Sequence, residues 1–204
     1  MKLQLILASV ITLTGGCVTS PVPNSGTYVE ARTASVFAGA CHYGAEYTTS
    51  GREAVMAWRF EEGPASGAEV VAFVSSRQNL AENSSDRQSV VYLGGSQDAC
   101  ELALQGLRAN GCLGEILHVG EGADVQTQGD QFVVLGGEEL HLRGELIPDR
   151  ACCSMPSQRW YLPLGTTAPG VVGKSEIFDC DVPSMKVRFA RTGENDAIVS
   201  SFTL

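Results

Sequence analysis

Two short segments contain the side chains most capable of chemistry in this sequence. Cys41 and His42 are adjacent in the first segment, and Cys152, Cys153 and Met155 lie close together in the second. Thiolate, thioether and imidazole groups are ligands that together favour a soft metal ion, above all Cu(I). If the two segments pack against each other, they supply enough donors for one site. The sequence therefore predicts a copper site formed by these residues.

The N-terminus has the features of an export signal. A positive start at Lys2 is followed by the apolar run Leu3–Leu13 and by small residues that end directly at Cys17. A run of this length is too short for a permanent membrane span and is typical of a cleaved signal peptide. The small residues before the cysteine resemble the lipobox of bacterial lipoproteins, although Leu13 stands one place earlier than usual. We expect residues 1–16 to be removed and Cys17 to be lipidated; the alternative is an ordinary secretory signal that leaves Cys17 as a spare thiol.

The lipobox resemblance implies a location in the cell envelope of a bacterium. Val18 follows the lipidated cysteine where many inner-membrane lipoproteins have aspartate, which implies the outer membrane, facing the periplasm. The net charge of −9 argues against binding to nucleic acid or to anionic lipid. Attachment to the membrane would therefore depend on the acyl chains of Cys17. The sequence does not identify a protein partner.

Export also suggests a second use for the cysteines, because disulfide bonds persist in an oxidising compartment. Adjacent cysteines rarely bond to each other, so Cys152 and Cys153 would each take a separate partner. A bond from Cys41 to either of them, and from Cys180 to the other, would use both segments. Six cysteines allow fifteen pairings, and the sequence cannot choose among them. A disulfide-stabilised structural or protein-binding lipoprotein is therefore the alternative to the copper-binding protein.

No motif indicates an enzyme. The sequence has no CxxC or HExxH pair and no GxSxG turn, and the apparent phosphate loop at Gly173-Lys174-Ser175 has Ala168 where the first glycine is required. Thiol redox chemistry at Cys41 is the least unlikely enzymatic role, but a free catalytic thiol is vulnerable in an oxidising compartment. We expect a non-enzymatic protein without catalytic residues.

The pattern of apolar residues predicts one domain over residues 27–204, after a tether over residues 17–26 that contains two prolines and a glycine. One helix is expected at about residues 96–110, with Ser96 as N-cap and a stop at Asn110-Gly111. Most other apolar segments alternate as strands do. The expected fold class is α+β, with a strand-dominated, mostly antiparallel sheet and one main helix. The expected strands are 28–37, 54–60, 70–74, 89–93, 115–119, 131–135, 140–147, 159–162, 184–191 and 197–204.

Three stretches of the chain resemble a bacterial domain-of-unknown-function family that carries cysteines after its first strand. They are residues 27–42, 54–63 and 149–156, and the likeness extends over most of residues 27–204. Members of that family often have a denser CxC-type cluster, in whose place this chain has a single Cys41 with His42. The resemblance implies the domain, and it implies no activity.

Overall fold

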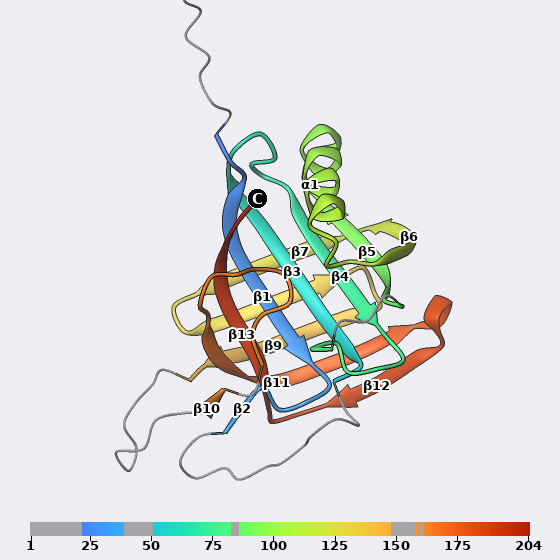
Figure 1. Cartoon of the computed structure of the whole chain (residues 1–204), viewed down its shortest axis with the longest axis vertical. Coiled ribbons are helices and arrows are strands. Elements are labelled where there is room, and N and C mark those ends of the chain that lie inside the picture. The colour runs from blue at the N-terminus through green and yellow to red at the C-terminus, as the bar shows by residue number, and fades with distance from the viewer. Residues whose placement is uncertain (1–21, 39–50, 83–85, 148–157, 160) are drawn as a thin grey trace, which may run out of the picture.

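The computed structural model describes residues 22–38, 51–82, 86–147, 158–159 and 161–204, and most of them belong to strands that wrap around one another (Figure 1). Eleven strands form one large sheet, and two short strands form a separate ladder. The described residues contain one α-helix, and it lies on the outside of the sheet (Figure 1). The elements are β1 (Ser25–Arg32), β2 (Phe37–Ala38), β3 (Glu53–Glu62), β4 (Glu69–Ser75), β5 (Gln88–Gly94), α1 (Gln97–Asn110), β6 (Glu115–Glu121), β7 (Ala123–Gln128), β8 (Gln131–Gly136), β9 (Leu140–Leu146), β10 (Gln158–Arg159), β11 (Val171–Val182), η2 (Pro183–Met185), β12 (Val187–Arg191) and β13 (Glu194–Thr203).

The large sheet is curved into a nearly closed, barrel-like shape. Its strand order is β6-β5-β4-β3-β1-β13-β11-β9-β8-β7, with β12 beside β11. Neighbouring strands are antiparallel except β5 and β6, which run parallel. The two strands that end this order, β6 and β7, are joined at Gly122, whose N–H donates to the Leu93 carbonyl at 3.0 Å. β7 then packs across from β3, β4 and β5, which brings the two ends of the sheet together.

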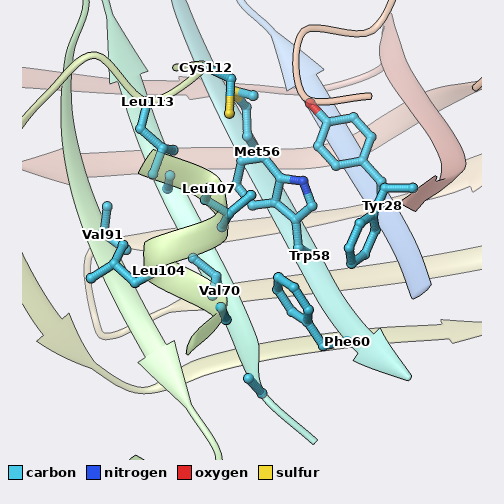
Figure 2. Close-up of a cluster of buried hydrophobic side chains, with 14 of the residues drawn as sticks. Tyr28, Met56, Trp58, Phe60, Val70, Val91, Leu104, Leu107, Cys112 and Leu113 are labelled. Atoms are coloured by element: carbon cyan, nitrogen blue, oxygen red, sulfur yellow. The ribbon is translucent and has the colours of Figure 1, made fainter. Parts of the chain in front are cut away.

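The curvature gives the sheet two separate cores. The inner core fills the barrel and contains side chains from opposite walls, including Val71, Phe73, Phe132 and Phe178. The outer core lies between the convex face of β3 and β4 and the helix α1 (Figure 2). Because both faces of these strands are covered, five consecutive residues of β3 and five of β4 are buried.

Helix α1 begins and ends where the sequence indicates, and this prediction is confirmed. Ser96 is the N-cap, and its side chain accepts a hydrogen bond from the N–H of Ala99. Gly111 ends the helix with φ of 79°, a left-handed conformation that glycine adopts without strain, and its N–H donates to the Leu107 and Arg108 carbonyls. In the described part of the chain, no helix is long and apolar enough to cross a membrane.

The predicted α+β fold class is wrong. The strands are mostly antiparallel as expected, but they form a large mixed sheet that almost closes on itself, with one helix packed outside. An α+β fold would place the helix against one face of an open sheet. Here the inner face of β1, β3, β4 and β5 is covered instead by β7, β8, β9 and β11, through the inner core. Apolar residues on both faces of a strand indicate burial, and they do not reveal what buries each face.

Leu107→Ala tests the packing of α1 on the outer core. Leu107 is fully buried between the helix and the sheet. Its truncation should lower the free energy of unfolding by about 3 kcal/mol, because it removes apolar contacts and leaves a cavity. The control is Leu102→Ala on the same helix, where the side chain is 42% exposed and the expected loss is below about 1 kcal/mol. Urea unfolding followed by circular dichroism measures both, and equal losses would contradict this packing.

Candidate functional site

The residues predicted to bind a lipid or a metal lie outside the described residues. They are Cys17, Cys41, His42, Cys152, Cys153 and Met155. The structure does describe the chain that leads into and out of the two cysteine-containing segments, residues 39–50 and 148–157. The positions of these flanking residues constrain where the two segments start and end.

One small antiparallel ladder brings the start of the first segment next to the end of the second. β2 precedes the first segment and β10 follows the second, and these two strands pair with each other. Ala38 is opposite Gln158, and Phe37 is opposite Arg159. In an antiparallel pair, opposite Cα atoms are about 4.5–5.5 Å apart. The first segment, which follows Ala38, therefore begins at the same end of the ladder where the second segment, which precedes Gln158, ends.

A small hydrophobic cluster fixes this ladder against the barrel. Val172 of β11 and Ile198 of β13 are buried with Val36, which lies directly before β2. Ile147, the last described residue before the second segment, packs on the same cluster, as does Tyr161. The N–H of Ile147 also donates to the Val172 carbonyl at 2.9 Å. Residues that flank both cysteine-containing segments thus meet on one patch of the barrel wall.

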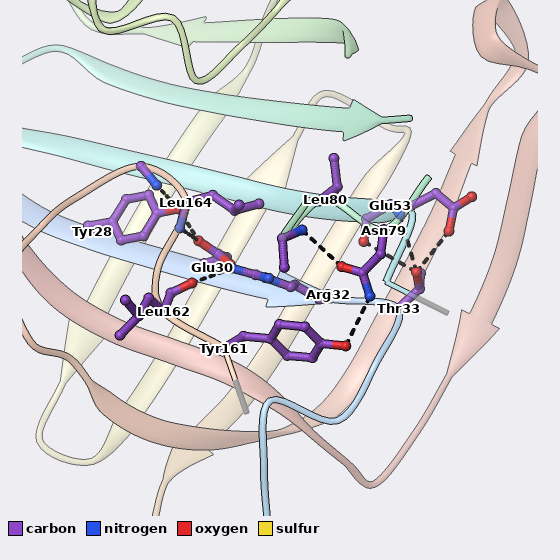
Figure 3. A network of polar contacts seen from close by, with 12 residues as sticks. Tyr28, Glu30, Arg32, Thr33, Glu53, Asn79, Leu80, Tyr161, Leu162 and Leu164 are labelled. Carbon is purple, nitrogen blue, oxygen red and sulfur yellow. Dashed lines mark hydrogen bonds and ion pairs between the residues drawn. The ribbon is translucent and has the colours of Figure 1, made fainter. Parts of the chain in front are cut away.

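A buried polar network holds the chain that follows β10 (Figure 3). Glu30 and Arg32 lie on the outer face of β1, with side chains 0% and 1% exposed, and Arg32 Nε donates to Glu30 Oε1 at 2.5 Å. Arg32 Nη2 donates to the Leu162 carbonyl at 2.5 Å. The N–H of Leu164 donates to Glu30 Oε2 at 2.7 Å, and the Tyr28 hydroxyl also donates to this oxygen. We call residues 161–165 the strap.

The two ends of the strap are held by aromatic side chains. The Arg32 guanidinium carbon lies 4.9 Å from the centre of the Tyr161 ring, within range of a cation–π contact. The Tyr161 hydroxyl accepts a hydrogen bond from Asn79 Nδ2 at 2.9 Å. At the other end, the N–H of Gly165 donates to the Tyr28 hydroxyl at 3.1 Å. Burial, and then the nearby Glu30 carboxylate, raise the pKa of Tyr28 well above its usual value, so this hydroxyl stays protonated.

Sequence analysis did not predict this buried network, although the alternation of charged and apolar residues in β1 is visible in the sequence. Glu30 and Arg32 alternate with apolar residues along β1, as solvent-facing residues of a strand do. Because the strap covers this face, the alternating charged residues form a buried pair and not a solvent-exposed surface. Nothing in the local sequence identifies residues about 130 positions away as the segment that covers this face.

The cysteines in the described residues are Cys100, Cys112 and Cys180, and all three are free and buried. Burial raises the pKa of Cys100, and it raises the pKa values of Cys112 and Cys180 to about 12. These thiols remain protonated at neutral pH, and the thiolate is the form that binds metals and attacks electrophiles. The predicted disulfide to Cys180 is absent from the structure. Cys100, in the first turn of α1, and Cys112, just after its end, do not pair with each other either.

The described histidines do not form a site. His118 lies on β6 and His141 on β9, and both side chains are exposed. Among residues 22–38, 51–82, 86–147, 158–159 and 161–204, no group of three or more histidine, cysteine, aspartate and glutamate side chains is placed to hold a metal ion.

One buried carboxyl group stands apart from the network. Asp196 of β13 is fully buried, and it accepts hydrogen bonds from the Ser175 hydroxyl at 3.0 Å and from the Ser175 N–H at 3.3 Å. Burial raises the pKa of Asp196 to about 7, against the lowering effect of these hydrogen bonds. A group that titrates near neutral pH inside the fold couples folding to pH.

Comparison with known proteins gives no further assignment: no family model, curated protein or solved structure matches this chain. The resemblance to a bacterial domain of unknown function therefore stays a prediction.

Glu30→Gln tests whether the buried pair stabilises the fold. The variant leaves the Arg32 charge buried without its carboxylate, and it should lower the free energy of unfolding by about 3–5 kcal/mol. The matched control is Glu176→Gln in the Arg143–Glu176 pair, whose side chains are 50% and 47% exposed. Loss of this exposed pair should cost less than about 1 kcal/mol. Chemical denaturation measures both variants, and an equally small effect at Glu30 would contradict a structural role for the network.

Asp196→Asn tests the pH dependence of stability. Folded Asp196 keeps its proton up to about pH 7, whereas an unfolded aspartate loses it near about pH 4. The folded state therefore binds the extra proton between these values. The Asp196 contribution to stability should fall as pH rises from about 4 to about 7, by at most about 1.4 kcal/mol per pH unit, and then level off. The difference in unfolding free energy between wild type and variant, measured across this range, should follow that course; a constant difference would contradict it.

Proposed function

We propose that this protein is a lipid-anchored component of the bacterial cell envelope that binds Cu(I). Cys17 would carry the anchor, and the barrel would present the metal site outside the membrane. The proposed ligands come from the two cysteine-containing segments: Cys41, His42, Cys152, Cys153 and Met155. This choice of metal follows from the donor set, since thiolate and thioether sulfur select soft ions.

The observation that supports this proposal is the pairing of β2 with β10. It holds Ala38 and Gln158 opposite each other at one end of a ladder. Cys41 is three residues after Ala38, and Met155 is three residues before Gln158. A chain spans at most about 3.6 Å per residue, so each of these Cα atoms lies within about 11 Å of its own side of the ladder. Chain length therefore allows Cys41 and Met155 to meet at this end of the ladder, which supports the proposal.

Proximity alone would be weak support if the ladder could separate. Its attachments make separation costly, because Val36, Ile147 and Tyr161 share one buried cluster with β11 and β13. The strap that follows β10 is held by the Glu30–Arg32 pair as well. A site next to such a support would need no movement of the ladder itself when the metal binds, which favours affinity.

The described cysteines do not compete for the metal. Cys100, Cys112 and Cys180 are buried and protonated at neutral pH. Each of these residues is at most 5% exposed, so its thiol presents little surface to Cu(I) in solution. Metal binding should therefore involve only the cysteines near the ladder.

The pairing of β2 with β10 also fits the alternative function, in which Cys41 forms a disulfide with Cys152 or Cys153. That protein would bind no metal and would serve as a disulfide-stabilised structural or protein-binding lipoprotein. The two functions differ in the state of the thiols outside the cores. The copper-binding protein needs Cys41, Cys152 and Cys153 to be reducible together without loss of the fold.

Cu(I) titration of the mildly reduced protein tests the proposal. A chromophoric Cu(I) chelator should lose one equivalent of metal to the wild-type protein. Cys41→Ser and Cys153→Ser should each lower the affinity at least about tenfold, because each removes one thiolate ligand. The control is Cys100→Ser, in which the hydroxyl can keep the hydrogen bond that the Cys100 thiol donates to the Gly94 carbonyl at 3.2 Å. This control should bind as the wild type does.

Thiol labelling of the folded protein, purified without reductant, separates the alternatives. An inaccessible pair at Cys41 and Cys152 or Cys153, together with no uptake of Cu(I) after reduction, would contradict the metal site and support the disulfide. Retention of Cu(I) by the Cys41→Ser variant at wild-type affinity would also contradict it.

A further inference from the structure

Strand β12 has one edge that no described strand covers. β12 pairs with β11 on one side, and within the described residues no other strand pairs with it. In Figure 1, β12 lies beside the last part of β11, residues 178–182. β13 continues along β11 after the turn at Thr192 and Gly193, and it does pair with β1. The exposed edge is therefore limited to residues 187–191.

The hydrogen bonds of β11 show which β12 groups point to this edge. The N–H of Asp181 donates to the Glu139 carbonyl at 2.8 Å, on the side of β11 away from β12. In an antiparallel pair, a residue that directs its backbone groups away from its partner faces one that does the same. Arg188 is opposite Asp181, and Ala190 is opposite Asp179. The backbone N–H and C=O groups of Arg188 and Ala190 thus point away from β11, along the open edge.

A basic pocket lies along this edge. It has a volume of about 520 Å³, and it is formed by β12 with the residue before it, by Arg52 and Glu53 where β3 starts, and by Thr33 after β1. Four cationic side chains line it: Arg52, Lys186, Arg188 and Arg191. A concentration of cations is notable in a chain whose net charge is −9. The carboxylate in the pocket, Glu53, already accepts a hydrogen bond from the Thr33 hydroxyl at 2.8 Å.

These cations are only partly neutralised. Arg188 lies 3.5 Å from Asp181, but the two side chains are 83% and 53% exposed, so the pair is weak. Arg191 is 3.1 Å from Glu194. Among the described residues, Arg52 and Lys186 have no ion-pair partner. The edge therefore offers both unpaired backbone groups and positive charge.

We propose that β12 binds an extended acidic peptide segment of a partner protein, which adds to the sheet as a further strand. The Arg188 and Ala190 backbone groups would supply the main-chain hydrogen bonds, as in other cases of β-strand addition. Acidic side chains on alternate positions would meet the basic pocket, while Val187 and Phe189 line its apolar part. A second copy of this chain fits poorly, because pairing of two β12 edges brings Arg188 and Lys186 near their own equivalents.

The probe is a fluorescein-labelled peptide, Thr-Glu-Val-Glu-Val-Glu-Thr with blocked termini, titrated with the full chain and followed by fluorescence anisotropy. The wild type should bind it with an affinity that falls as salt rises. Two N-methylated forms of the peptide carry the methyl groups on alternate sets of amides. Only one set faces β12 in an added strand, so one form should lose binding and the other should keep it.

Variants of the protein test the charges and the edge separately. Lys186→Glu combined with Arg188→Glu should weaken binding at least about tenfold, whereas Arg143→Glu on β9 should change it less than about twofold. Ala190→Pro removes an N–H that faces the open edge and should abolish binding with the β11 pairing intact. If this variant fails to fold, the N-methylated peptides still test the edge.

Three results would overturn the proposal. The first is no binding of the acidic peptide at protein concentrations up to about 1 mM. The second is equal binding of both N-methylated forms, which would indicate ionic contact without strand addition. The third is equal binding of a peptide with lysine in place of each glutamate.

Discussion

The Glu30–Arg32 pair on the outer face of β1 is the interaction on which the arrangement of the candidate site depends. Two charges removed from water are costly, and their mutual attraction offsets this cost only if further hydrogen bonds are made. The strap supplies these bonds through the Leu162 carbonyl and the Leu164 N–H. If the strap left the barrel, both charges would lose partners. The pair therefore fixes the path of the chain after β10. It also fixes the ladder at which the first cysteine-containing segment begins and the second one ends.

The cysteines of this protein fall into two groups with different surroundings. Cys100, Cys112 and Cys180 belong to the apolar cores, where burial keeps their thiols protonated. The sequence alone treats Cys180 as a partner for the clusters, because a list of cysteines does not distinguish a core thiol from a ligand. The proposed metal site and the proposed peptide-binding edge also use different parts of the molecule. The first depends on the β2–β10 ladder, and the second on β12 and the start of β3.

Local features of the fold could be predicted from the sequence, and features set by distant contacts could not. Helix α1 was predicted closely because its cap residues, Ser96 and Gly111, act within one turn of the chain. Most strands were placed, but β7 and β11 were missed. In β7 only Ala123 and Val125 are apolar, and in β11 polar residues from Lys174 to Glu176 interrupt the apolar residues. The fold class failed for a related reason, since closure depends on the packing of β7 across from β4. The candidate ligands could be named from residue type. The burial of Glu30 and Arg32 could not be predicted, because it depends on the strap, which is far away in sequence.

The central claim is that the buried pair, through the strap and the ladder, positions the two segments proposed to bind the metal. The most direct test is the Cu(I) affinity of Glu30→Gln, measured under conditions where the variant is folded and compared with Glu176→Gln. Glu30 is buried within the network, whereas Glu176 is in an exposed pair on β11. The account predicts a Cu(I) affinity at least about tenfold lower for Glu30→Gln, with Glu176→Gln equal to wild type. Equal affinities in all three proteins would contradict it.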